Sequence, residues 1–152
     1  MRLFTLWSCA LLVLTTLALA ADGKSKVYNV GKDRFALKGY DPVSYFDGKP
    51  LKGEIAHWLE HDGLFYRFAT PANLEKFKAG PTRYAPAYGG WCATAMAKAD
   101  KVDVDPLNYK ITDGRLFLFY KGAWGDALAK WNKDEANLTT KADAAWKKLA
   151  GE

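Results

Sequence analysis

Cysteine and histidine are scarce in this sequence. Two cysteines, Cys9 and Cys92, and two histidines occur among 152 residues. Cys9 lies in the predicted export signal described below, so the mature chain would hold one thiol and no partner for an internal disulfide. A lone thiol in an oxidising compartment fills the core, holds a ligand, pairs with another protein or reacts. The sequence also lacks a haem-attachment motif, a phosphate-binding glycine loop and a nucleophile triad.

Runs of like charge are missing too. The formal net charge of +5 falls to +4 once Arg2 is removed, and basic and acidic residues are interspersed along the chain. This pattern predicts a solvated surface and argues against nucleic acid as a partner. After residue 20 no apolar run is long enough to cross a membrane.

The N-terminus has the features of an export signal. A basic start precedes an apolar run over residues 3–20, which ends in the Ala-x-Ala pattern Ala18-Leu19-Ala20. This arrangement is typical of signal peptidase sites. We therefore predict a signal peptide over residues 1–20 and a single mature domain over residues 21–152, located in the periplasm or secreted. The alternative is an uncleaved anchor, because about 18 apolar residues can just span a bilayer.

The mature chain predicts one small α+β domain with two β-hairpins, an intervening helix and a helical C-terminal tail. Strand-like residues flank Asp-Gly turns at 55–68 and 109–120, and each stretch predicts a hairpin. Between them Thr70 suits an N-cap and Pro71 the first position of a helix. Aromatic residues make up 14% of the chain, which predicts a core built on packed rings. No internal repeat is apparent.

Further helices are expected on either side of the second hairpin. Residues 91–98 form an alanine-rich run with good helix propensity. The tail predicts helix in two pieces, at 125–132 and 140–149.

Several short motifs follow one another in a specific order along the mature chain. They are Gly39-Tyr40-Asp41-Pro42-Val43-Ser44-Tyr45-Phe46, Tyr66-Arg67-Phe68, the run from Pro81 to Ala93 that ends in Tyr88-Gly89-Gly90-Trp91-Cys92-Ala93, and Ile111 to Tyr120. Together these motifs resemble the YHS domain family. They are more similar still to its exported bacterial branch, whose members carry a Tyr-Gly-Gly-x-Cys-Ala signature.

The resemblance implies a small metal-binding module, because YHS domains are often found beside copper and other heavy-metal transport proteins. It also implies a role for Cys92, because selenocysteine sometimes stands at the matching position in the exported branch. This chain departs from the usual metal-binding form, which has cysteine where Ser44 stands and further cysteines in the stretch matching residues 69–73. A zinc site of four cysteine ligands is therefore excluded.

Cys92 is the leading candidate for chemistry. It follows Gly89-Gly90 and is expected in the first turn of a helix, where unpaired N–H groups stabilise a thiolate. Met96 lies four residues further on, so both sulfurs would share a helix face and suit Cu(I). The alternative for Cys92 is a small buried residue, and for Met96 it is a place in the core.

Other residues are expected to complete a site around Cys92. Tyr84, Tyr88 and Trp91 would line an aromatic pocket beside the thiol. His57 and His61 are further candidate metal ligands, but about 10 Å or more separates them along an extended strand. Surface exposure is the alternative explanation of both histidines.

These observations leave three hypotheses for function. The first is an exported accessory protein in which Cys92 binds copper or another soft metal, or performs redox chemistry, with a metal-handling or redox protein as partner. The second is a non-catalytic binding or scaffold module in which Cys92 is buried and structural. The third is a thiol-dependent enzyme such as a peroxide-reducing protein, which lacks a resolving cysteine and a nearby base. The sequence therefore favours a role without catalysis.

Overall fold

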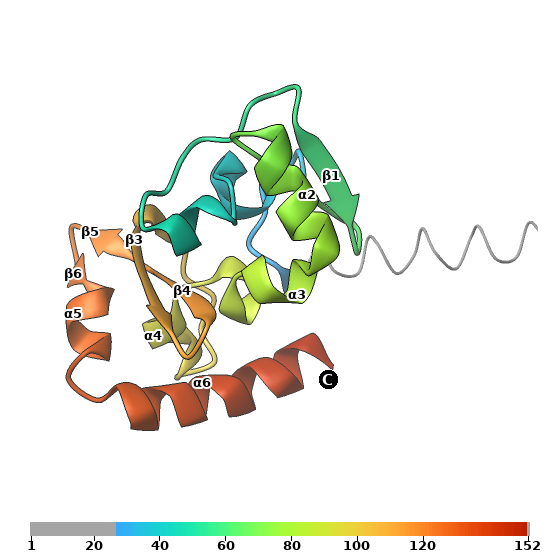
Figure 1. Ribbon diagram of the computed structural model, residues 1–152. Coiled ribbons are helices and arrows are strands. Elements are labelled where there is room, and N and C mark those ends of the chain that lie inside the picture. Colours follow the sequence, from blue (N-terminus) through green and yellow to red (C-terminus); the bar gives the residue numbers. More distant parts are fainter. Residues whose placement is uncertain (1–26, 152) are drawn as a thin grey trace, which may run out of the picture.

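Short helices alternate with antiparallel β-hairpins in residues 27–151, the part of the chain that the computed structural model describes (Figure 1). In chain order the elements are the 3-10 helices η1 (Ala36–Gly39) and η2 (Ser44–Asp47), strands β1 (Trp58–His61) and β2 (Leu64–Arg67), helices α2 (Pro71–Ala79) and α3 (Pro81–Tyr84), the 3-10 helix η3 (Ala87–Gly90), helix α4 (Ala93–Met96), strands β3 (Asp105–Thr112), β4 (Arg115–Phe119), β5 (Lys121–Gly122) and β6 (Gly125–Asp126), and helices α5 (Ala127–Trp131) and α6 (Glu135–Ala150). The expected α+β class, with two hairpins, a helix between them and a helical tail, is confirmed. The predicted signal peptide lies outside the described residues.

Both predicted hairpins form around their Asp-Gly turns. Asp62 and Gly63 have φ of 54° and 78° between β1 and β2, and Asp113 and Gly114 have φ of 52° and 71° between β3 and β4. Two successive positive φ angles match the twist of the flanking strands, and Asp-Gly tolerates them at low cost. The hairpin of β5 and β6 was not predicted, because strands of two residues carry no periodic signal.

The start of α2 is as predicted, whereas α4 and α6 differ from expectation because their local signals are weak. At α2 the Thr70 hydroxyl accepts a hydrogen bond from Asn73 N at 3.1 Å, as an N-cap should. The alanine-rich run forms only one helical turn, α4, because Ala99 turns left-handed with φ of 60° just after it. Helix α6 begins at Glu135, earlier than predicted.

Among residues 27–151, no helix combines the length and apolar character that a membrane span requires.

Two segments repeat the same backbone path, although their sequences differ. We call residues 35–67 the first half and residues 86–118 the second half. Each contains three consecutive residues with left-handed φ, which are Leu37, Lys38 and Gly39 (55°, 52°, 78°) in the first half and Tyr88, Gly89 and Gly90 (55°, 59°, 83°) in the second. An extended residue follows in both, at Tyr40 and Trp91. A short helix and then a hairpin complete each half.

The hydrogen bonds of the halves correspond at a constant offset of 51 positions (86 − 35). The Asp41 amide donates to Leu51 O at 2.9 Å, and the Cys92 amide donates to Val102 O at 3.0 Å. The matching parallel bridges join Phe35 with Phe65 and Pro86 with Leu116. Cys92 in the second half therefore occupies the position that Asp41 has in the first.

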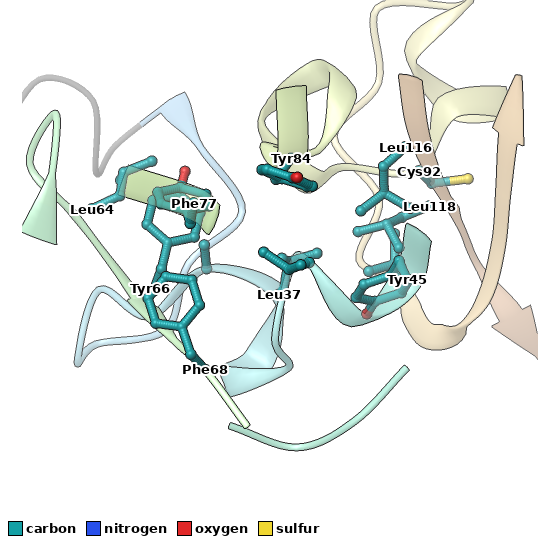
Figure 2. Packing of buried hydrophobic residues seen from close by; sticks show 13 residues of the cluster. Leu37, Tyr45, Leu64, Tyr66, Phe68, Phe77, Tyr84, Cys92, Leu116 and Leu118 are labelled. Carbon is teal, nitrogen blue, oxygen red and sulfur yellow. The ribbon is translucent and has the colours of Figure 1, made fainter. Parts of the chain in front are cut away.

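Two buried clusters make up the core, and β4 contributes to both. Leu116 and Leu118 point into the first cluster, while Phe117 and Phe119 point into the second, as the alternation of a strand requires. The first cluster, part of which Figure 2 shows, has the fully buried Phe77 beside aromatic rings from β2 and α3. The second surrounds Trp131 of α5 and is closed by α6, which lies along one end of the molecule beside α4 (Figure 1).

Candidate functional site

Cys92 is held in place by its backbone. It is the N-cap residue of α4, and its carbonyl oxygen accepts a hydrogen bond from Met96 N at 2.9 Å. A parallel bridge connects it to Leu118 of β4. The residue is 1% exposed, and its thiol forms no hydrogen bond with any of residues 27–151. Cys92 is thus anchored by main-chain interactions and fills space with its side chain.

The surroundings of the thiol are apolar. Cys92 belongs to the first core cluster, and Figure 2 shows it beside Leu116 and Leu118 with its sulfur directed away from Tyr84. A solvent-borne ion or oxidant reaches this sulfur only if the packed side chains around it move apart. The environment is the one that free cysteine ordinarily has as a small core residue.

Met96 does not share its packing environment with Cys92. The methionine is 0% exposed and belongs to the second core cluster, with Phe117 and Trp131. The expected pairing of two sulfurs on one helix face therefore gives way to packing in two separate clusters. The cause is the backbone of Cys92, which as the N-cap has a non-helical ψ of 117°, so its side chain leaves the helix face on which Met96 lies.

The three aromatic residues expected to line a pocket are spread over the fold. Tyr84 packs edge-to-face on Phe46, with ring centroids 5.3 Å apart, in the first cluster. Tyr88 lies in the second cluster. Trp91 is half-buried, and its indole N–H donates to Val27 O at 2.7 Å. These rings act mainly as packing elements that fix the backbone around the Cys92 position.

The histidines lie in the first hairpin region, remote from the thiol. His61 contacts the ring of Phe77 edge-on, with centroids 6.0 Å apart. Its cross-strand partner Leu64 stands at the opposite end of the cluster from Cys92 in Figure 2. His57 is half-buried, and its Nδ1 has no hydrogen-bond partner within the described chain. Across residues 27–151, no three His, Cys, Asp or Glu side chains gather closely enough to hold a metal ion.

Asp41 forms a buried polar network that the sequence did not reveal. The residue is 0% exposed. Its Oδ1 accepts a hydrogen bond from Val43 N at 2.8 Å, and its Oδ2 accepts from Ala69 N at 2.8 Å and from Asn73 Nδ2 at 2.7 Å. The carboxylate therefore fastens the first half to the beginning of α2. Its only sequence signal was the Asp-Pro pair, which is equally common in turns.

A second polar network connects α6 to the second half. Arg115 donates two hydrogen bonds to the Asp143 carboxylate, the shorter at 2.7 Å, and the Tyr88 hydroxyl donates to the same carboxylate at 2.8 Å. Burial raises the pKa of Tyr88, so its hydroxyl stays a donor. Burial also acts to raise the pKa of Asp143, but the bonds from Arg115 and Tyr88 outweigh it and hold that pKa below its ordinary value. The network is a structural clamp on α6.

The most conspicuous surface residue is Trp124. It is 83% exposed at the tip of the β5–β6 hairpin and stacks on Tyr120, with centroids 5.7 Å apart and ring planes 24° from parallel. Other large apolar side chains are also exposed, namely Leu51, Ile55, Trp58 and Leu107. Exposed aromatic residues of this kind are enriched where proteins bind partners.

Comparison with known proteins adds no relative: the chain matches no protein-family model, no curated protein and no solved structure. Fold and side-chain geometry therefore carry the functional argument. They define a small α+β domain of two similar halves, with Cys92 buried in the core and Trp124 exposed on the surface.

Proposed function

We propose that this protein is a non-catalytic binding module in which Cys92 is a structural core residue. The observation that carries the proposal is the contrast between the thiol, which is 1% exposed among apolar side chains, and Trp124, which is 83% exposed. Binding by such a module takes place on its surface. The resemblance to exported YHS domains and the export signal stay predictions, and they would place the module in the periplasm or outside the cell.

The dispersal of the candidate ligands supports the same proposal. A soft-metal site needs two or more sulfur or imidazole ligands around one point. Cys92 and Met96 pack in different clusters, and the histidines belong to the first hairpin region. A copper or redox site at Cys92 would therefore require the core to rearrange around the ion or partner. The scaffold interpretation requires no such change.

Thiol accessibility tests the proposal directly. The native protein is treated with an uncharged alkylating reagent, and the rate of Cys92 modification is compared with the rate in 6 M guanidinium chloride. We expect native modification to be slower by more than about a thousandfold, because the reaction requires opening of the core. Modification at a rate near that of the unfolded chain would contradict the proposal.

A metal titration completes the test. Cu(I) is titrated into the wild type and into Cys92→Ala in competition with a chromophoric Cu(I) chelator. The proposal predicts the same weak competition by both proteins. Tight one-to-one binding that is lost in Cys92→Ala would replace the scaffold proposal with the soft-metal hypothesis. A circular dichroism spectrum of Cys92→Ala controls for loss of fold.

A further inference from the structure

A recess of about 660 Å³ opens between the end of α4 and the C-terminal part of α6. Its lining consists of four alanines, Leu149 and three lysines, which are Lys98, Lys141 and Lys148. Recesses of several hundred cubic ångströms are the usual size of small-ligand sites. This recess has an apolar lining and carries only positive charge, because no acidic residue lines it.

The three lysines carry charges that the described chain does not neutralise. Neither Lys98, Lys141 nor Lys148 has an ion-pair or hydrogen-bond partner among residues 27–151, whereas Lys38 and Lys110 each pair with a carboxylate. Asp143, which lies on the same helix as two of them, is held by Arg115. Three unneutralised ammonium groups around one recess concentrate anions there.

Helix geometry sets the spacing of charge and apolar surface on α6. Lys141 and Lys148 are seven residues apart, which is about two turns or 10.5 Å along the axis. Ala144 and Ala145 lie on the same face between them. Lys98 comes from the opposite wall, in the left-handed turn at the end of α4. An apolar strip thus runs between cationic groups, and the lysine alkyl stems add to it.

We propose that this α4–α6 recess binds a single-chain anionic amphiphile, a molecule with one carboxylate head and one alkyl chain. The lysine ammonium groups pair with the carboxylate, and the alkyl chain covers the alanine and leucine side chains. The proposal rests on the proposed function, since it names the ligand class of a binding module. It follows from two complementary properties of one surface: unpaired positive charge and exposed apolar lining.

The test uses dodecanoate, kept below its micelle concentration, and the purified ¹⁵N-labelled protein. We expect amide shifts at residues 97–99 and 141–149, with a dissociation constant on the order of 100 μM, as for one acyl chain in an apolar environment. Octanoate should bind at least about tenfold more weakly, because each buried methylene contributes to affinity. Dodecyltrimethylammonium has the same chain with the opposite charge and should give no shifts in these residues.

Matched variants locate the site. Lys141→Glu with Lys148→Glu should weaken dodecanoate binding by about tenfold or more, because two attractive charges become repulsive. Lys130→Glu with Lys133→Glu makes the same change in net charge outside the recess and should leave affinity unchanged. Ala144→Phe, at an exposed position, fills the recess and should also abolish binding without a change of charge.

Each result has a defined reading. Dodecanoate shifts confined to the recess, lost in the Lys141 and Lys148 double variant alone, support the proposal. Shifts that are absent, or equally affected by both double variants, overturn it. Binding to phosphatidylglycerol vesicles without binding of monomeric dodecanoate also overturns it, in favour of a membrane surface. The thiol experiments are independent of all these outcomes, so an inert Cys92 with no dodecanoate binding would reject this inference and leave the proposed function standing.

Discussion

The two halves of the molecule build the same backbone turn around opposite kinds of side chain. In the first half the turn leads to Asp41, whose carboxylate is buried and accepts hydrogen bonds from Val43, Ala69 and Asn73. In the second half it leads to Cys92, which is equally buried and whose thiol forms no hydrogen bond within residues 27–151. The same position serves as a polar anchor in one half and an apolar anchor in the other.

This difference changes how Cys92 is interpreted. Rarity in the sequence pointed to chemistry at Cys92, but its counterpart is a residue with a structural role. Asp41 holds its turn to the beginning of α2, and Cys92 bridges to Leu118 of β4, so a structural role accounts for both positions. The comparison therefore favours a structural Cys92, and changes at the two positions should have different signatures.

The largest effect is expected from Asp41→Ala. The substitution leaves three N–H donors without an acceptor, two of them buried and one half-buried, and each such loss costs about 1–3 kcal/mol. We expect the free energy of unfolding, measured with urea, to fall by about 3–5 kcal/mol. Asp47→Ala, on the exposed end of η2, is the matched control and should change stability by less than about 0.5 kcal/mol. A loss below about 1 kcal/mol for Asp41→Ala would mean that the network is not an anchor.

The next largest effect is expected at Gly89, whose equivalent in the first half is Lys38. Substitution by alanine should destabilise the protein more at Gly89 than at Lys38. A Cβ on Gly89 would stand 2.6 Å from the ring of Trp146 and 3.0 Å from that of Tyr28, at a φ of 59°. We expect Gly89→Ala to cost about 2–3 kcal/mol, from overpacking and left-handed strain together. The measurement is again urea unfolding.

Lys38→Ala supplies the control for that pair. Lys38 already has a side chain at φ of 52°, so alanine introduces no new backbone strain. The change removes an exposed ion pair with Asp103 and a hydrogen bond to Val104 O, which together contribute about 1 kcal/mol. Equal losses at positions 38 and 89 would show that α6 does not press on the second half as the structure describes.

A smaller effect should identify Cys92 as an apolar anchor. Cys92→Ala removes one sulfur from a packed site and should cost about 1 kcal/mol. Cys92→Ser is closer in size but buries a hydroxyl without a partner, so we expect a loss of about 2–3 kcal/mol. The order is decisive, because a thiol in a polar environment would tolerate serine better than alanine. Thermal and urea unfolding of both variants measure it.

Sequence reasoning located the elements whose signals are local. Local interactions between neighbouring residues form the Asp-Gly turns at 62–63 and 113–114 and the Thr70 N-cap, so the sequence predicts them. The repeat was not, because most equivalent positions share φ angles and not residue types, with Gly39 and Gly90 and the two Asp-Gly turns as exceptions. Leu37 and Tyr88 are both left-handed, and neither residue type signals that conformation.

The candidate site was less predictable than the fold for the same physical reason. Composition could single out Cys92, but its burial depends on β4, which arrives from later in the chain. The spacing of Lys141 and Lys148 around two alanines was visible on a helix, whereas Lys98 joins them only through the packing of α4 on α6. Contacts between distant segments decide both features, and no local pattern encodes them.

The smallest effect concerns the Arg115–Asp143 clamp that holds α6 on the second half, a feature with no counterpart in the first. Both side chains are more than a third exposed, so solvent screening limits the contribution of the pair to about 0.5–1 kcal/mol. The folded pKa of Asp143 is lowered, so this contribution is complete above the unfolded pKa of about 3.9 and is lost as pH falls through the folded value. Urea unfolding of wild type and Asp143→Asn should therefore differ at pH 7 and converge in strong acid. A gap that persists unchanged below the folded pKa would assign the effect of Asp143 to packing rather than charge.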